Sequence, residues 1–365
     1  MSRRQDARRM LASSVCSEAA RNLASGTSRA LLLVLGVLVL IGGAAGMDVR
    51  TIVGLSASAA DFRQSGAAIQ VFTAPAGVSG QRCDALRSVP GVVAAGAARP
   101  AAAPAVFLSA PDAGIGTVEA TPGLLGVLES SARPRVGGWL SQSAAATLGA
   151  VPGTTLPTSL GAVEVTAEFP YPDDASDRSL AYALLTPVPP TGVFDSCWVL
   201  VWPHSEAVVA LVRGTFVGDP AEQSAATVAQ LNTRLGAVFD GPRMFTGRAT
   251  AQAPVVTALL GLALGAGSVR TRRLELAGAL HAQVPKDALV AQIGLELLAV
   301  ALASALPLTA VTHVLAAHGN PDPLWPAWSA GLRAVATGSL ATVLGGVLMA
   351  ATTSEKRLFQ YFKER

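Results

Sequence analysis

The chain has 365 residues, of which 51% are hydrophobic and only 14% are charged, and its mean hydropathy is +0.46. Because globular chains carry about 25% charged residues, this composition excludes a disordered chain, a coiled coil and most soluble enzymes. The net charge of +3 is the balance of 27 basic and 24 acidic residues. This excess is too small and too scattered to make nucleic acid the main partner.

Four apolar windows are long enough to cross a bilayer, which takes about 20 helical residues. They cover residues 30–47, 249–269, 289–315 and 334–354, and Pro307 predicts a kink in the third. The first window could instead be a cleaved signal peptide ending near residues 44–46. The residues before it are long for such a peptide, and they carry a helical stripe formed by Leu11, Val15, Ala19 and Leu23. We therefore expect an amphipathic entry helix followed by an uncleaved span.

The orientation follows from the basic residues near the spans. Arginine and lysine gather before the first span, between the second and third, and after the fourth. By the positive-inside rule these segments lie in the cytoplasm. We expect a multi-pass protein of the cell (inner or plasma) membrane, with cytoplasmic termini and a large extracytoplasmic segment between the first two spans. Two glycine pairs, Gly42/Gly46 and Gly261/Gly265, have the spacing of close helix contacts, or merely reflect a glycine-rich chain.

The segment between the first two spans is rich in Pro, Gly, Thr and Ser. Residues 48–64 are expected to continue the first span as a helical stalk. Short alternating runs predict strands at residues 67–74, 91–99, 162–169 and 197–203, and helices at 81–88, 137–149 and 220–235. The expected fold is α-helical with four spans in a 1+3 arrangement, carrying an α+β outer domain with a βαβ opening and two lobes on the stalk.

The three cysteines fall on both sides of the membrane in this topology. Cys83 and Cys197 lie outside, where an oxidising compartment permits a disulfide, and Cys16 lies inside. Two buried thiols that pack as small apolar side chains are the alternative for the outer pair.

Catalytic motifs are missing from the sequence. There is no G-x-x-x-x-G-K-[ST] phosphate loop, no His or Cys spacing typical of zinc sites and no G-x-S-x-G elbow. We therefore expect no catalytic residue, no metal and no cofactor on this chain. Glu296 is the one ionisable residue well inside a span, where it either serves a functional cavity or makes a structural hydrogen bond.

Four segments carry a resemblance to a known family. The chain reads RRLELAGALHAQVPK from Arg272, followed by Glu296 in the third span. This resembles the RRREIxxLRALGAxxxxI…E segment of the MacB/FtsX-type ABC permeases, the membrane subunits of type VII ABC transporters. Ala19–Leu23 looks like the entry helix of that family. The runs CDALRSVPGVVAAGA and GGWLSQSAAATLGAVPGTTL are similar to parts of its periplasmic core domain.

The resemblance implies a short cytoplasmic helix that couples the permease to a separate ATPase. The residues implied in coupling are Arg272, Arg273, Glu275, Leu276, Ala279, Leu280 and His281. ATP and Mg²⁺ would bind to the partner subunit, so the chain itself is not expected to be an enzyme. The implied partners are an ABC ATPase dimer and a second permease, identical or homologous, with an extracytoplasmic accessory protein as a further option and no nucleic acid.

The predicted domain boundaries follow from these segments. They are residues 1–29 for the entry helix, 30–64 for the first span and stalk, 65–240 for a MacB-like core domain, 241–269 for a stalk and the second span, 270–287 for the coupling helix, 288–317 for the third span, 318–333 for an outer loop, 334–354 for the fourth span and 355–365 for a cytoplasmic tail.

The function that the resemblance implies is mechanotransmission. ATP hydrolysis on the partner would move the stalks, and the outer domain would move or extract an amphiphilic cargo such as a lipid, a peptide or an antibiotic. One alternative is an FtsX-like regulatory permease that activates a cell-wall hydrolase or a sensor without transport. Another is an anchored binding protein with no ATPase, which leaves the basic segment after the second span unexplained.

Overall fold

The computed structural model describes residues 12–26, 28–129, 136–219 and 225–354. The chain divides into two compact units, one formed by residues 1–58 and 241–365 and the other by residues 59–240. We call the first the helical unit and the second the sheet unit.

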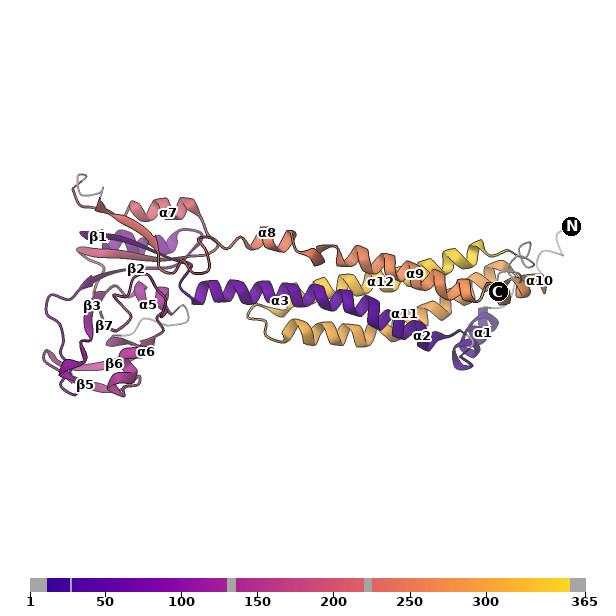
Figure 1. Ribbon diagram of the computed structural model, residues 1–365, viewed down its shortest axis with the longest axis horizontal. Helices are drawn as coiled ribbons and strands as arrows, with labels where there is room; N and C mark the ends of the chain where they lie inside the picture. The colour runs from indigo at the N-terminus through magenta and orange to yellow at the C-terminus, as the bar shows by residue number, and fades with distance from the viewer. Residues whose placement is uncertain (1–11, 27, 130–135, 220–224, 355–365) are drawn as a thin grey trace. The chain divides into compact units, whose positions relative to one another are not determined.

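The helical unit contains long apolar helices that run beside one another (Figure 1). In chain order its elements are α1 (Ala12–Ala24), α2 (Ala30–Gly36), the π-helical turn η3 (Val37–Ile41), α3 (Gly42–Gln64), whose last turn enters the sheet unit, α8 (Gly241–Thr246), η7 (Ala249–Gln252), α9 (Ala253–Thr271), α10 (Arg273–His281), α11 (Lys286–Ala317) and α12 (Leu324–Thr352). In the described part of the chain, four helical segments are long and apolar enough to cross a membrane: Ala30–Gln64, Ala249–Thr271, Lys286–Ala317 and Leu324–Thr352. Each overlaps one predicted window, which indicates a multi-pass membrane protein.

Small residues set the packing of α9 on α12. A Cβ atom added to Gly265 would overlap the carbonyl oxygen of Thr342, and one added to Gly261 would overlap that of Gly338. The two backbones therefore approach too closely for any side chain at these positions, as small-residue pairs allow in lipid. The glycine spacing in the second span is thus explained by a contact within the chain.

The sheet unit is built on one mixed nine-stranded sheet with the order β5-β6-β4-β7-β3-β2-β8-β1-β9. Its strands are β1 (Ile69–Ser79), β2 (Val92–Pro100), β3 (Gly116–Ala120), β4 (Gly138–Ser141), β5 (Thr155–Thr158), β6 (Gly161–Phe169), β7 (Ala183–Pro187), β8 (Val193–Val201) and β9 (Thr227–Gln230). Its helices are α4 (Gly80–Ala85), η4 (Leu86–Ser88), η5 (Pro111–Ala113), α5 (Gly123–Leu128), α6 (Gln142–Leu148) and α7 (Glu206–Arg213). The lobes that the sequence predicts share this one sheet.

The predicted βαβ opening is present with one strand inserted. β1 and β2 both pair with β8 in antiparallel register, so β8 lies between them and they run in the same direction. Trp198 of β8 is 1% exposed and Trp139 of β4 is 0% exposed, which places both indoles in the apolar core. The predicted strand at residues 197–203 overlaps β8, which starts four residues earlier and ends at Val201.

Two helix predictions are wrong in part. Of the helix predicted at residues 220–235, residues 220–224 lie outside the described residues, and in the rest β9 pairs with the edge of β1, with Thr227 opposite Thr73. Within residues 137–149, the first four residues form β4 and only the rest is helical. The Ser141 hydroxyl accepts a hydrogen bond from the Ala144 amide, so Ser141 is the N-cap at which α6 begins. Sheet pairing outweighs local helix propensity in both cases.

Candidate functional site

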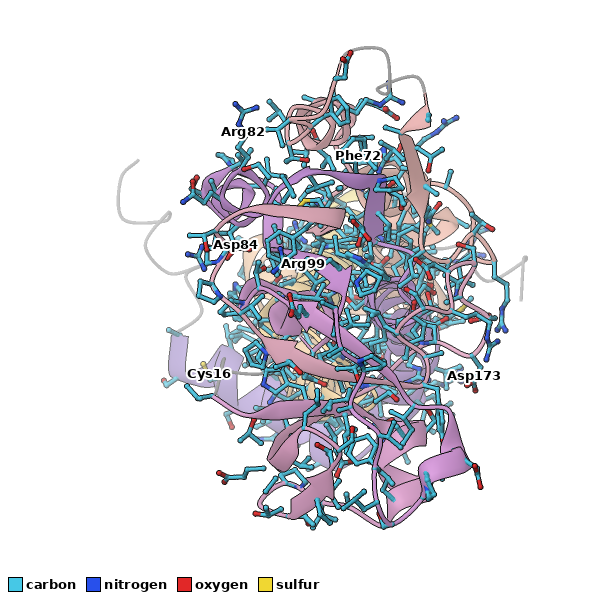
Figure 2. All side chains as sticks on the ribbon, turned by 90° about the vertical axis from the view of Figure 1, so that its left-hand side faces the viewer. Cys16, Phe72, Arg82, Asp84, Arg99 and Asp173 are labelled. Atoms are coloured by element: carbon cyan, nitrogen blue, oxygen red, sulfur yellow. A yellow bond between two sulfur atoms is a disulfide. The ribbon has the colours of Figure 1, made fainter. Side chains whose placement is uncertain are left out.

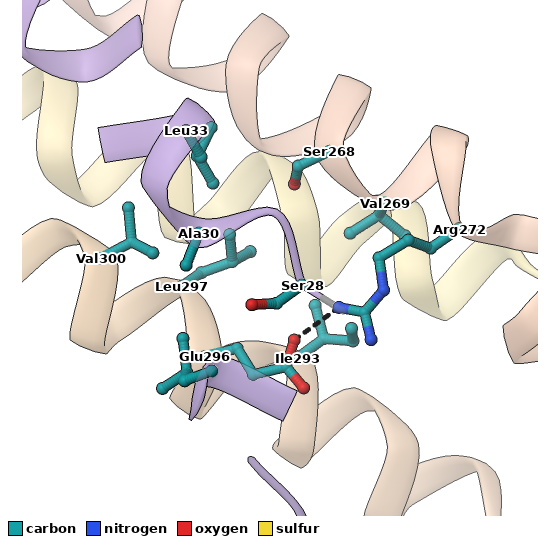
Figure 3. Close-up of a pocket in the computed structure, with 11 residues that line it drawn as sticks. Ser28, Ala30, Leu33, Ser268, Val269, Arg272, Ile293, Glu296, Leu297 and Val300 are labelled. Atoms are coloured by element: carbon teal, nitrogen blue, oxygen red, sulfur yellow. Dashed lines mark hydrogen bonds and ion pairs between the residues drawn. The ribbon is translucent and has the colours of Figure 1, made fainter. Parts of the chain in front are cut away.

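A buried ion pair joins two helices of the helical unit at one end of the bundle. Arg272 lies between α9 and α10, and its Nη1 donates to Oε2 of Glu296 on α11 at 2.5 Å. The side chain of Arg272 is 9% exposed and that of Glu296 is 4% exposed. Figure 3 shows the guanidinium reaching across to the carboxylate, with Ser28 beside them. The one carboxylate inside a predicted span therefore has a cationic partner.

Glu296 also accepts hydrogen bonds from two amides. Asn22 of α1 donates from Nδ2 to Oε1 at 2.8 Å, and Gln292, one turn earlier on α11, donates to the same oxygen at 3.3 Å. Because α1, α11 and the α9–α10 junction all contribute, the cluster ties three separate helical segments together. We call Asn22, Arg272, Glu275, Gln292 and Glu296 the junction cluster.

The charge of Arg272 is balanced by two carboxylates. Its Nη2 and Nε donate to Glu275 at 3.2 and 3.3 Å, one turn into α10. Burial alone lowers the pKa of the Arg272 guanidinium, but the hydrogen bonds to Glu275 and Glu296 outweigh burial and leave this pKa above its ordinary value. The guanidinium therefore stays charged and holds α10 at a fixed place against α11.

The apolar residues of α10 face their own bundle. Leu276 is 6% exposed and packs in a cluster with Leu33, Leu289 and Ile293, and Ala277 is fully buried. Ala279 and Leu280 are half-buried against the same cluster. Leu276 is thus not available to a partner protein.

The exposed edge of α10 consists of other residues. Glu275, Gly278 and His281 are exposed, followed by Ala282 directly after the helix, whereas Arg273 is half-buried and interacts within the chain. The spacing of three and four residues places Glu275, Gly278 and Ala282 on one face of the helix. Of the residues implied in coupling, the structure leaves Glu275 and His281 on the surface and buries Arg272 and Leu276.

A second buried ion pair lies at the other end of the second apolar segment. Arg248, just before η7, donates from Nε to Asp48 of α3 at 2.8 Å and from Nη2 at 3.3 Å, and Asp48 is 1% exposed. The guanidinium also stacks on the Phe245 ring, 4.1 Å from its centroid. Sequence reasoning missed this pair, although Asp48 directly follows the first apolar window and Arg248 directly precedes the second.

The structure joins Cys83 of α4 to Cys197 of β8 by a disulfide that spans 114 residues, with the two Cα atoms 5.8 Å apart. Both side chains are fully buried, and Cys16 is a free, exposed thiol. The bond fixes α4 to the centre of the sheet. Within the described residues, no group of three or more His, Cys, Asp or Glu side chains could hold a metal ion.

Comparisons with solved structures include a weak structural likeness. No family model matches the chain, and no curated protein matches it either. Among solved structures, the periplasmic region of MacB from Actinobacillus actinomycetemcomitans is similar at 11% sequence identity and a TM-score of 0.32. The match covers 46% of this chain and 91% of that one. At this TM-score the likeness by itself assigns neither family nor function.

Proposed function

We propose that the chain is the membrane subunit of an ATP-driven ABC transporter of the MacB/FtsX type. A separate ATPase would hydrolyse ATP with Mg²⁺, and the permease would pass the resulting motion to its outer domain, which acts on an amphiphilic cargo. A second permease copy, identical or homologous, would complete the assembly. Both termini and α10 would lie in the cytoplasm.

The observation that carries this proposal is the junction cluster. A nine-residue helix between two membrane segments is a natural contact for a cytoplasmic partner, but it transmits force only if it is held firmly. Arg272 connects α10 to Glu296 of α11, and Asn22 connects α1 to the same carboxylate. A push on α10 would therefore be shared by the second and third spans and by the entry helix.

The surface of α10 that would meet the ATPase is its exposed edge at Glu275, Gly278 and Ala282. A Cβ atom at Gly278 would meet no atom within 4 Å, so this edge is open and can be approached closely. The buried apolar residues of α10 anchor the helix to the bundle, and the exposed edge is left for docking.

The proposal is tested by affinity purification of the tagged chain from its own cells, with mass spectrometry and an ATPase assay on the eluate. We expect a stoichiometric ATP-binding subunit and vanadate-sensitive turnover. Gly278→Trp should remove that subunit from the eluate, because its Cβ would meet no atom of this chain within 4 Å and the indole would project from the docking edge. The matched control Gly278→Ala should retain it.

Two results would contradict the proposal. The first is an eluate free of ATPase under crosslinking, which would leave an anchored binding protein. The second is full ATPase retention and turnover in Gly278→Trp, which would remove α10 from the interface. A cell-wall hydrolase that co-elutes with the ATPase would support the regulatory alternative instead of transport.

A further inference from the structure

The sheet unit contains a groove of about 510 Å³. This volume lies within the range of roughly 300–1,000 Å³ that is typical of small-molecule sites. Its walls come from the last turn of α3, the first residues of β1 and β2, β8, the end of α5 and the loop after β6. Asp173, next to the loop wall, lies on the opposite side of the view in Figure 2 from Asp84 of α4. Neither Asp84 nor the disulfide cysteines Cys83 and Cys197 are among the residues that line the groove.

Apolar side chains line one part of the groove. Val93, Leu128 and the ring of Tyr171 form its accessible surface, and the buried side chains of Ile69, Val127 and Leu200 lie beneath. Val93 is 52% exposed, so its side chain is accessible to a ligand in the groove. The Tyr171 hydroxyl is already used, because it donates to the Asp177 carbonyl oxygen at 2.6 Å. Tyr171 thus offers the groove its ring face.

The cationic group of the groove is held in place but not neutralised. The guanidinium of Arg63 lies over the Trp202 ring, 5.3 Å from the centroid, and its Nε donates to the Ala59 carbonyl oxygen at 3.4 Å. Neither Nη nitrogen of Arg63 has an acceptor among the residues that the structure describes. The other charged wall residue, Glu129, is engaged in an interaction of its own. The groove therefore has one positioned cation with donors to spare.

We propose that this groove binds an anionic amphiphile, with the acyl or other apolar chain along Val93, Leu128 and the ring of Tyr171 and the anionic head on Arg63. An apolar wall favours a hydrocarbon chain by removing it from water, and two free N–H donors in a fork match a carboxylate or a phosphate. The proposal deepens the proposed function by naming the class of cargo. Only the role of the bound amphiphile as cargo rests on that function; binding in the groove does not.

The position of Arg63 suggests how such a site would be used. Ala60, Arg63 and Gln64 form the last turn of α3, a single helix that begins at Gly42. One wall of the groove is thus the end of the helix that carries the first apolar segment. A shift of this helix along or about its axis moves the head-binding cation relative to the apolar wall, which would release a bound chain.

The test is photocrosslinking of the full-length protein in phosphatidylcholine nanodiscs. The probes are palmitate with a diazirine in its chain and the matching uncharged diazirine-bearing hexadecanol, and the labelled peptides are mapped by mass spectrometry. We expect palmitate to label peptides that contain residues 60–69, 93, 127–129 or 170–172, and unlabelled palmitate to compete. Hexadecanol should label these peptides about tenfold less, the loss expected when one charge-assisted contact is missing.

Three variants sharpen the test. Arg63→Gln should reduce groove labelling by palmitate about tenfold, and Val93→Trp should abolish it by filling the space. Arg213→Gln, at an exposed arginine outside the groove, should label as the wild type does. An unchanged melting temperature shows that each variant is folded.

Labelling confined to the membrane helices, or groove labelling that survives Val93→Trp, would overturn the site. Equal labelling by both probes, unchanged in Arg63→Gln, would overturn the anionic head. None of these readouts needs an ATPase, so failure of the groove and failure of the proposed function are distinguishable.

Discussion

Loss of one charge of the junction cluster should destabilise the helical unit more than the loss of a surface ion pair would. Removing one partner of a buried pair costs about 3–5 kcal/mol, because the other charge stays buried. Glu296→Leu should lower the free energy of unfolding by about 3 kcal/mol, since Arg272 keeps its two hydrogen bonds to Glu275. Arg272→Met should lower it by about 5 kcal/mol, since Glu296 then keeps only its hydrogen bonds from the neutral amides of Asn22 and Gln292.

The double variant Arg272→Met/Glu296→Leu separates this explanation from a simple packing defect. Replacing a whole buried pair by apolar side chains is often neutral, so the double variant should regain most of the loss. The free energy of unfolding is measured by SDS titration in mixed micelles for all four proteins. If the double variant loses as much stability as the two single variants together, a buried unpaired charge is not the cause of the losses. The recovered double variant should also couple ATP turnover poorly, because the link between α10 and α11 is gone.

Three further predictions concern packing, the disulfide and pH. Gly265→Ala should cost about 1–3 kcal/mol by overpacking α9 against α12, whereas Gly267→Ala, with open space around its Cβ, should cost nothing in the same SDS titration. Replacing Cys83 and Cys197 together by Ser should lower the stability of the sheet unit by about 2–5 kcal/mol, and equal melting temperatures with and without reductant would contradict it. Burial raises the pKa of Asp84 above its ordinary 3.8 against the opposing hydrogen bond from Thr121, so the folded state binds this proton more tightly. The resulting stabilisation of the wild type is complete below about pH 3.8 and is lost as the pH rises through the folded-state pKa. The melting temperature of Asp84→Asn, measured relative to that of the wild type, should therefore rise between about pH 3.5 and about pH 7. Melting temperatures of the two proteins that change in parallel with pH would contradict this.

The membrane helices were predictable because their signal is local. A run of apolar residues that can span a bilayer leaves few other structures open, and the helix continuing through residues 48–64 was also expected. The sheet was harder, since pairing partners lie far apart in the sequence. Thr227–Gln230 lies in a segment predicted as a helix over residues 220–235, and its pairing with β1 makes it a strand.

The sequence predicted some residues of the junction cluster but not how they pair. Glu296 and Arg272 were both singled out, but their pairing depends on how α9 and α11 pack, which periodicity does not give. The orientation of α10 could not be predicted, because its apolar residues suit a partner ATPase and its own bundle equally well. Burial of Leu276 decides between them. Asn22 carried no signal of its own, since an amide in an amphipathic helix is ordinary.

Affinity purification of the full-length chain from its own cells tests the central claim most directly, with Gly278→Trp and Gly278→Ala beside the wild type. We expect a stoichiometric ATPase and vanadate-sensitive turnover with the wild type and Gly278→Ala, and neither with Gly278→Trp. An eluate without an ATPase, even after crosslinking, would contradict the claim that this chain is the permease of an ATP-driven transporter.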